Sequence, residues 1–285
     1  MTMTDIVYLN GDFVSKASAK ISVLDRGFLF GDGIYEVIPV YKGQAFRLSE
    51  HLRRLDASLK AIRLANPYKA AQWQSLIDQV IAKSGQQHLS IYIQISRGCQ
   101  EQRNHLAGDS LEPTVLIMPG PLSTDVAELR PIKAALLEDI RWQYCHIKSV
   151  SLLANILLRQ EAESQGCQEA ILHRGNMLTE GATSNIFLVK NNEIHTPKKN
   201  RYILGGITRD LIIELAEKAG IKVQQRDIEV PELLQADEAW VSSSSREISP
   251  VTQINDKIVS SGTIGPVTKA IHSAFQSFKQ ALIND

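Results

Sequence analysis

The stretch Glu180-Gly181-Ala182-Thr183-Ser184-Asn185-Ile186-Phe187-Leu188-Val189 runs from a turn of small residues into an apolar segment. This pattern predicts a strand with the carboxylate of Glu180 at its entrance. Earlier in the chain, Lys148 lies within Cys145-His146-Ile147-Lys148-Ser149-Val150-Ser151-Leu152-Leu153. A lysine among apolar neighbours loses hydration of its ammonium group. We therefore expect the pKa of Lys148 to fall and its free amine to be nucleophilic toward carbonyls.

A nucleophilic lysine and a glutamate before a strand together suit pyridoxal 5'-phosphate. This cofactor needs an amine that condenses with its aldehyde and an acidic group that pairs with its protonated pyridine nitrogen. Lys148 and Glu180 are the candidates for these roles. Taken singly, Lys148 is a lysine whose stem packs while its amine reaches water, and Glu180 is a turn residue. The two together favour the cofactor.

Several further motifs, in order along the chain, resemble the class IV aminotransferases, which are the fold-type IV family of pyridoxal phosphate enzymes. The matching stretches include residues 25–36, 50–55, 179–187 and 206–210, together with Lys148. The resemblance covers nearly the whole chain. It implies a two-domain α+β and α/β fold with a small α+β domain and a larger domain that has a β-barrel-like core and helices.

Periodicity alone does not give this division, but local patterns mark a linker zone. The zone contains Gly120, Pro121, Ser123 and Pro131. We expect a small domain over 1–119, a linker over 120–131 and a large cofactor-binding domain over 132–285. Apolar periodicity and helix signals place helices near 49–64, 69–83, 151–165, 207–219 and 265–282. Strands are expected near 89–96 and 114–118, after a hairpin that turns at Lys42-Gly43-Gln44.

A cofactor phosphate needs hydrogen-bond donors and positive charge, and the sequence offers three sources. Leu204-Gly205-Gly206-Ile207-Thr208 is a glycine turn before a helix, whose first N–H groups and dipole favour phosphate. Arg54 can donate two parallel bonds, and Ser242-Ser243-Ser244-Ser245 offers hydroxyl groups. Singly, the turn is an ordinary helix entry and the serine run an ordinary loop. The family pattern implies cofactor contacts at Arg54, Leu204, Ile207, Thr208, Ser243 and Ser244.

A candidate substrate loop follows the strand predicted near 89–96. Arg103 and His105 are two residues apart, so in extended chain both point to one face, where they can clamp a carboxylate. The simpler interpretation is an exposed polar loop. D-amino acid transaminases of the family carry such an Arg-x-His pair, and a tyrosine that matches Tyr35 completes their carboxylate trap. The sequence most resembles this group.

The resemblance implies ping-pong transfer of an amino group from D-alanine or D-glutamate to 2-oxoglutarate or pyruvate, with Lys148 also moving the Cα proton. Branched-chain L-amino acid aminotransferases usually have a glycine-rich run after the lysine, where this chain has Ser149-Val150-Ser151. Aminodeoxychorismate lyases usually have an arginine a few residues after it, and here the nearest is Arg159. Both activities remain alternatives, as does a catalytically silent homologue that only binds the cofactor.

Composition bounds the partners of the 285-residue chain. Its 31 basic and 31 acidic residues cancel, so no global field attracts nucleic acid or an anionic membrane. Three cysteines without a Cys-x-x-Cys pair argue against a disulfide framework and a zinc site, and we expect no metal. The N-terminus does not resemble a signal peptide, so the expected compartment is the cytoplasm. The resemblance implies a homodimer in which the loop at 97–105 reaches the active site of the neighbouring subunit.

Overall fold

The computed structural model describes residues 5–108, 111–122 and 128–284. The chain forms two compact units, each described by itself below. Unit 1 comprises Met1–Ser123 and Ile147–Leu152, and unit 2 comprises Thr124–His146 and Leu153–Asp285. The short segment that contains Lys148 thus belongs to unit 1, which differs from the expected placement of 132–285 in one domain. The expected boundaries at 119 and 131 stay a prediction.

Unit 1 is built on one antiparallel sheet with the strand order β2-β1-β6-β5-β3-β4. Its strands are β1 (Ile6–Leu9), β2 (Asp12–Ser15), β3 (Gly33–Tyr41), β4 (Gln44–Ala45), β5 (Leu89–Ser96) and β6 (Thr114–Gly120). Leu89, Ile91, Ile93 and Ile95 alternate along β5 and are all buried, because successive side chains of a strand point to opposite faces. The sheet therefore has one strongly apolar face.

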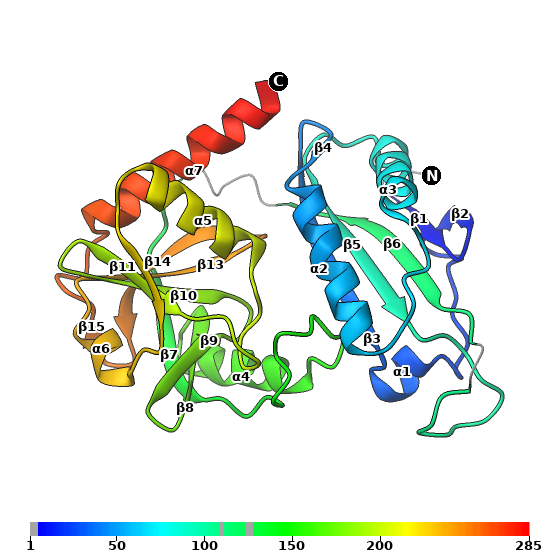
Figure 1. The fold of residues 1–285 in the computed structure, drawn as a ribbon, viewed down its shortest axis with the longest axis horizontal. Coiled ribbons are helices and arrows are strands. Elements are labelled where there is room, and N and C mark those ends of the chain that lie inside the picture. The colour runs from blue at the N-terminus through cyan, green and yellow to red at the C-terminus, as the bar shows by residue number, and fades with distance from the viewer. Residues whose placement is uncertain (1–4, 109–110, 123–127, 285) are drawn as a thin grey trace. The chain divides into compact units, whose positions relative to one another are not determined.

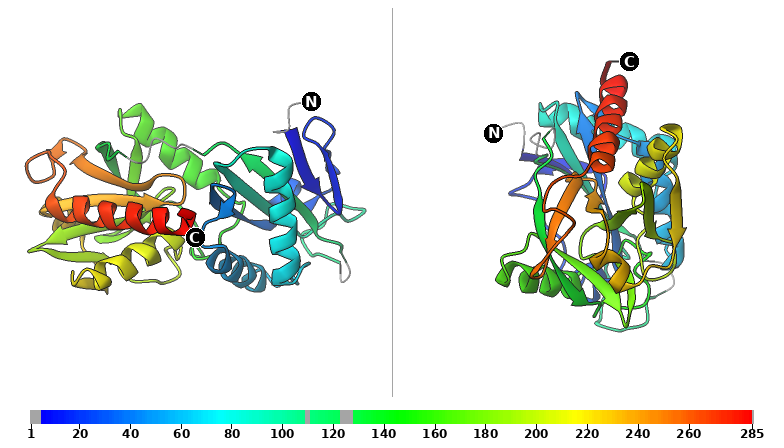
Figure 2. Two further views of the ribbon diagram at one scale, coloured as in Figure 1. Left: turned by 90° about the horizontal axis from the view of Figure 1, so that it is seen from above. Right: turned by 90° about the vertical axis from the view of Figure 1, so that its left-hand side faces the viewer.

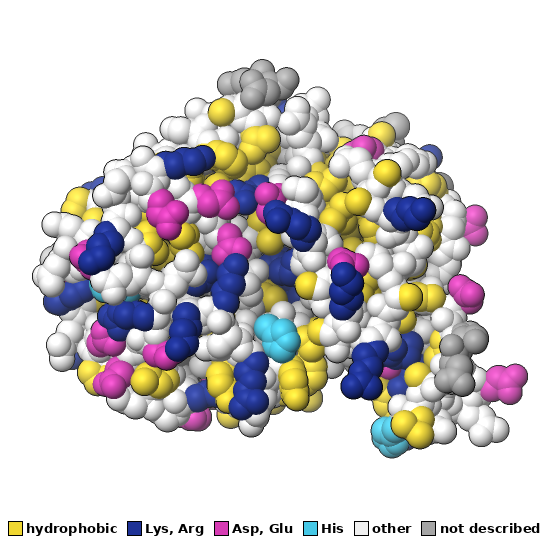
Figure 3. All heavy atoms as spheres, viewed as in Figure 1, with side chains coloured by type: hydrophobic (Ala, Val, Ile, Leu, Met, Phe, Trp, Pro, Cys, Tyr) yellow, Lys and Arg dark blue, Asp and Glu magenta, His cyan; other side chains and the backbone are white. Residues whose placement is uncertain are grey.

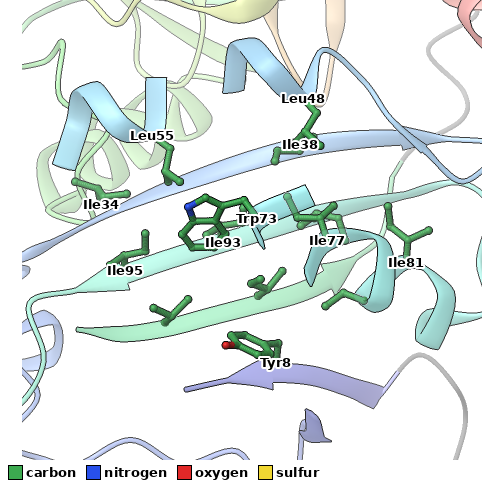
Figure 4. Close-up of a cluster of buried hydrophobic side chains, with 14 of the residues drawn as sticks. Tyr8, Ile34, Ile38, Leu48, Leu55, Trp73, Ile77, Ile81, Ile93 and Ile95 are labelled. Atoms are coloured by element: carbon green, nitrogen blue, oxygen red, sulfur yellow. The ribbon is translucent and has the colours of Figure 1, made fainter. Parts of the chain in front are cut away.

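Two helices cover that face, α2 (Leu48–Ala61) and α3 (Ala70–Ser84), and a short helix, α1 (Arg26–Phe30), precedes β3. Figure 4 shows Leu55 of α2 and Trp73 and Ile77 of α3 packed with isoleucines of β3 and β5. Truncating one such fully buried aliphatic side chain to alanine typically costs about 2–5 kcal/mol. This core fixes the position of β3, against which Lys148 lies.

Unit 2 has a nine-stranded sheet that curls into a half-barrel (Figures 1 and 2), with the order β12-β11-β10-β13-β14-β7-β8-β9 and β15 paired with β14. Neighbouring strands are antiparallel except for β11–β12, β14–β7 and β7–β8. The strands are β7 (Ile132–Glu138), β8 (Glu169–Arg174), β9 (Met177–Gly181), β10 (Asn185–Lys190), β11 (Glu193–Pro197), β12 (Val223–Arg226), β13 (Glu238–Ser243), β14 (Glu247–Ile254) and β15 (Lys257–Ile258).

The helices of unit 2 are α4 (Leu153–Ser164), α5 (Ile207–Lys218), α6 (Val230–Leu234) and α7 (Pro266–Asn284). Of these, α5 packs against β13 and α7, and the carboxylate of Glu238 caps α7 by accepting bonds from the N–H groups of Val267 and Thr268. The helices predicted near 49–64, 69–83, 151–165, 207–219 and 265–282 are present within a few residues of those bounds.

The visible surface carries no large region of one charge. On the face shown in Figure 3, basic and acidic side chains are interspersed. Within residues 5–108, 111–122 and 128–284, no helix combines the length and the apolar composition needed to cross a membrane.

Candidate active site

Lys148 lies in an irregular segment whose backbone is bonded to β3 and α2. The carbonyl of Lys148 accepts a bond from the N–H of Tyr35 at 2.9 Å, and the N–H of Val150 donates to Gly33 at 3.1 Å. The N–H of Lys148 donates to the Ser58 hydroxyl at 3.3 Å. These bonds fix the backbone of Lys148.

The Lys148 amine lies over the ring of Tyr35, with 4.0 Å between Nζ and the ring centre. In the described part of the chain Nζ has no hydrogen bond to a side chain or carbonyl and no ion pair with a carboxylate. The aromatic face contacts the amine but does not occupy the nitrogen with a fixed acceptor. An amine placed this way can react with a carbonyl without first breaking an ion pair.

Beside Tyr35, the buried Glu36 holds two basic groups of α2. Arg54 donates to both of its carboxylate oxygens, at 2.7 and 2.8 Å, and His51 Nδ1 lies 2.8 Å from Oε2. Burial opposes ionisation of Glu36, but Arg54 and His51 outweigh it and hold the pKa of Glu36 well below its usual range. Arg54 is therefore fixed in orientation, and the paired charges of Arg54 and Glu36 cancel. Any bond from Arg54 to phosphate would act without a net local charge.

In unit 2, Glu180 is buried on β9 with three donors around its carboxylate. Oε1 accepts from Arg141 Nη1 at 2.7 Å, while Oε2 accepts from Asn185 Nδ2 at 3.0 Å and from the N–H of Leu204 at 2.9 Å. Burial raises the pKa of Glu180 to about 7, against the pull of Arg141 and of the Leu204 N–H. A carboxylate has about four acceptor positions, so one further donor can be accommodated.

Arg141 is itself held by a second buried carboxylate. Arg141 donates to Asp139 through Nε at 2.9 Å and Nη2 at 3.0 Å, and Arg174 and Thr179 also donate to Asp139. Although burial opposes ionisation, Arg141 and Arg174 lower the pKa of Asp139. Positive and negative groups thus alternate from Arg174 through Asp139 and Arg141 to Glu180.

The start of α5 and the end of β13 meet around Asn185. The Asn185 amide donates to the carbonyl of Leu204 at 2.9 Å, and Asn185 pairs in register with Ser242. Gly206, which precedes α5, allows this approach because a Cβ there would overlap Oδ1 of Asn185. One asparagine therefore ties Glu180 to the glycine turn and to β13.

Donors suited to a phosphate lie near these turns. No side chain caps α5, so its first N–H groups are available, and the buried Thr208 hydroxyl is on its first turn. Within the described residues, the buried hydroxyl of Ser242 has no partner. Ser243 ends β13 and accepts from the N–H of Arg246 at 3.2 Å, while Ser244 is half-buried in the following turn. Together with the carboxylate of Glu180, these donors fit the phosphate and ring nitrogen of pyridoxal 5'-phosphate.

The predicted substrate loop is exposed but held at its backbone. Arg26 of α1, which is buried, donates to the carbonyls of Asn104 at 2.6 Å and His105 at 2.9 Å. The side chains of Arg103 and His105 both pack on the ring of Phe30. Within the described residues neither side chain is hydrogen-bonded to Tyr35 or Lys148.

Of the predicted residues, the structure brings Lys148 into contact with Tyr35, and Glu180 into contact with Leu204. Lys148 and Glu180 fall in different units, so their joint role stays a prediction, as do the roles of the other predicted residues. Sequence reasoning missed the groups that hold these side chains, namely Glu36, His51, Asp139, Arg141 and Asn185. Glu36 and Asn185 stand inside the quoted motifs. Asp139 and Arg141 carried only a weak signal, since opposite charges two residues apart share a face of extended chain.

No group of three or more His, Cys, Asp or Glu side chains suited to a metal ion occurs among the residues that the structure describes.

Comparison with known proteins places this arrangement in a family. Residues 33–254 match the family described as amino-transferase class IV. The chain is similar to a D-alanine aminotransferase of Listeria innocua serovar 6a, with 38% identity over 272 residues that cover 94% of each protein. The chain belongs to the class IV aminotransferases, with their fold-type IV architecture. These enzymes use pyridoxal 5'-phosphate, which is therefore its cofactor.

Solved structures agree on the fold. A branched-chain amino acid aminotransferase of Escherichia coli superposes with a TM-score of 0.90 and 29% identity, covering 96% of this chain and 94% of that one. A branched-chain aminotransferase of the archaeon Thermoproteus uzoniensis, solved with norvaline, gives a TM-score of 0.88 and 28% identity, covering 95% and 93%.

Proposed function

We propose that the chain is a D-amino acid transaminase that moves the amino group of D-alanine or D-glutamate to 2-oxoglutarate or pyruvate. The observation that carries the proposal is the loop at Arg103 and His105, whose backbone is held by Arg26 and whose basic side chains are exposed. Such a loop can bind a substrate carboxylate. The similarity to D-alanine aminotransferases supports the same assignment.

Each candidate residue then has a definite task. Bound pyridoxal 5'-phosphate supplies an electron sink for the bond broken at Cα of the substrate. Lys148 would hold the cofactor until substrate arrives and would then take and return the Cα proton on Nζ. Glu180 keeps the ring nitrogen protonated. Donors to the phosphate come from Arg54, Leu204, Ile207, Thr208, Ser243 and Ser244.

The handedness of the substrate follows from where its carboxylate is held. Nζ of Lys148 would act on the bound substrate from one side, because the backbone of Lys148 is held by β3. A carboxylate clamped by Tyr35, Arg103 and His105 turns the Cα–H toward Lys148 only in the D-isomer. The opposite preference would need the carboxylate at a different place.

A homodimer is part of this proposal. Exposed apolar side chains of unit 2 suit a subunit interface; they are Trp142, Tyr144, Leu153, Ile156 and Leu157. Arg103 and His105 contact Phe30 rather than Tyr35 or Lys148 in the described chain, which agrees with their serving the site of a second subunit.

Arg103→Ala tests the substrate assignment. Loss of a charge-assisted bond costs about 1.5–3 kcal/mol, so KM for D-alanine and D-glutamate should rise roughly tenfold or more. Cofactor retention and the visible spectrum should stay as in the wild type. Steady-state kinetics with D- and L-amino acids and 2-oxoglutarate measure this, with Arg53→Ala, an exposed arginine of α2, as the control.

The same assays distinguish the alternatives. The branched-chain L-amino acid aminotransferase is favoured by the solved structures that share this fold. Preference of the wild type for L-leucine or L-valine would establish that activity in place of the proposed one. Pyruvate release without a 2-oxo acid acceptor would indicate a lyase, and cofactor binding without turnover of any substrate would indicate a silent homologue.

A further inference from the structure

Arg141 is a buried arginine that the proposed function does not yet use. Its side chain is 5% exposed and lies in the segment that follows β7. One edge of the guanidinium, Nε and Nη2, is bound to Asp139, and Nη1 donates to Glu180 at 2.7 Å. Every direction in which the side chain could turn away from Glu180 would break a bond to Asp139.

Arg141 differs in kind from the other donors to Glu180. The Asn185 amide and the Leu204 N–H are neutral, so Arg141 is the one positively charged donor bonded to this carboxylate among the described residues. The other charged groups that face Glu180 are Asp139, which opposes its ionisation, and Arg209 of α5, which interacts at longer range. A buried carboxylate without a cationic partner becomes protonated rather than remaining charged.

The protonation state of Glu180 decides what it can do for a ring nitrogen. A carboxylate accepts a hydrogen bond and stabilises positive charge on the nitrogen, whereas a carboxylic acid donates its own proton and leaves the nitrogen neutral. A neutral ring withdraws electrons less strongly from Cα. The group that keeps Glu180 ionised therefore acts on the reaction without touching the cofactor.

We propose that Arg141, oriented by Asp139, is a positioning residue that keeps Glu180 ionised and aimed at the cofactor, so that the ring nitrogen of bound pyridoxal 5'-phosphate stays protonated. The proposal deepens the proposed function and rests on the role given there to Glu180. Arg174 and Thr179 in turn hold Asp139 in place, because both donate hydrogen bonds to its carboxylate.

The test is nitrogen NMR of the holoenzyme carrying pyridoxal 5'-phosphate labelled with ¹⁵N in the ring. Wild type should show the shift of a protonated pyridine. Arg141→Met, which keeps the length of the side chain and removes its charge, should move the shift toward that of a neutral pyridine. Arg141→Lys, which restores the charge, should return it most of the way. Lys279→Met breaks another buried ion pair of unit 2, with Glu247, and should leave the shift as in wild type.

Glu180→Gln separates failure of this inference from failure of the proposed function. If the ring stays protonated in Glu180→Gln, Glu180 is not the partner of the ring nitrogen. The role given to Glu180 in the proposed function then fails, and the role of Arg141 fails with it. If Glu180→Gln loses the ring proton and Arg141→Met keeps it, only the role of Arg141 is overturned. Should Arg141→Met not fold, Asp139→Asn carries the test. It is expected to lower the protonated fraction, and a wild-type shift in Asp139→Asn would overturn the proposal.

Binding of a ligand that cannot react with Lys148 gives a second readout. The apoenzyme is titrated by calorimetry with pyridoxamine 5'-phosphate and with its 1-deaza analogue, which has a CH group in place of the ring nitrogen. Wild type should prefer the natural ligand. Arg141→Met should reduce that preference roughly tenfold, the size of one charge-assisted bond. An equal loss of affinity for both ligands would show a structural role alone and would overturn the proposal.

Discussion

At the scale of single residues, the pKa values of two buried glutamates are shifted in opposite directions. Glu36 receives two bonds from Arg54 and one from His51, and its pKa is held low. Glu180 receives one bond from Arg141, which it shares with Asp139, and its pKa is raised to about 7. The difference follows from partner charge, since both carboxylates are fully desolvated. Each carboxylate accepts three hydrogen bonds, but Glu36 is held by two basic side chains, whereas the one cationic donor to Glu180 is shared with Asp139.

The acidity of Glu36 predicts how stability responds to acid. Because the folded pKa is lowered, the unfolded chain binds more protons. Stability from Glu36 is therefore complete above its ordinary value of about 4.3 and is lost as the pH falls below it. His51, whose pKa burial also lowers, adds a loss in the same direction that begins near pH 6.5.

Glu36→Gln should flatten the dependence of unfolding free energy on pH between about 5 and 3, where Glu36 titrates on unfolding. It should also cost about 3–5 kcal/mol at neutral pH, as expected when one partner of a buried ion pair is removed. Urea unfolding at a series of pH values measures both effects. Glu161→Gln, at an exposed position on α4, is the control, and equal slopes for Glu36→Gln and wild type would contradict the prediction.

At the scale of elements, the sequence predicted the helices that have clear apolar periodicity. Helices α2 and α5 show apolar periodicity, and Gly206 marks the start of α5. The single-turn helix α1 was missed, since five residues give no periodicity. The strand order of the sheet could not be predicted from local patterns either, because β1 pairs with β6, with Tyr8 opposite Ile117, far apart in the sequence. The same limit hid Arg141, whose partner Glu180 lies far along the chain.

Helix α1 matters because it carries Arg26, whose bonds to the carbonyls of Asn104 and His105 fix the candidate substrate loop. Arg26→Met should free that loop. Each bond from a charged donor contributes about 1.5–3 kcal/mol, so amide exchange at residues 103–106 should accelerate roughly tenfold or more. KM for D-alanine should rise while cofactor binding is retained.

Hydrogen-exchange mass spectrometry measures this change, and Arg97→Met is its matched control. Arg97 shares the partner Asp32 with Arg26 but donates to the carbonyls of Ile62 and Arg63 instead of the loop. Its loss should loosen the chain after α2 and spare residues 103–106. Identical exchange of the loop in Arg26→Met and wild type would show that Arg26 does not hold it.

At the scale of the whole molecule, the candidate residues are divided between the two units. Unit 1 carries Tyr35 on β3, Lys148 on the irregular segment bonded to β3, and Arg103 and His105 on a loop held by α1. Unit 2 carries Glu180 and the donors around Asn185. Each unit has its own core, so each can hold its share of the groups rigidly. The proposed dimer would make activity depend on the association of two chains.

Subunit mixing tests whether Arg103 serves the site of its neighbour. Lys148→Ala alone should be inactive because the nucleophile and base are lost together. Arg103→Ala alone should be weak at low D-alanine. In a dimer with one subunit of each kind, a shared site unites the intact Lys148 of one chain with the intact Arg103 of the other. Its kcat/KM should reach that of wild type at one site in two.

Separately tagged subunits, co-expressed and purified through both tags, provide the mixed dimer. Light scattering confirms its mass. If the loop serves its own subunit, no site in the mixed dimer is intact, and activity stays at the Arg103→Ala level. That result, or an active monomer, would contradict the proposed assembly.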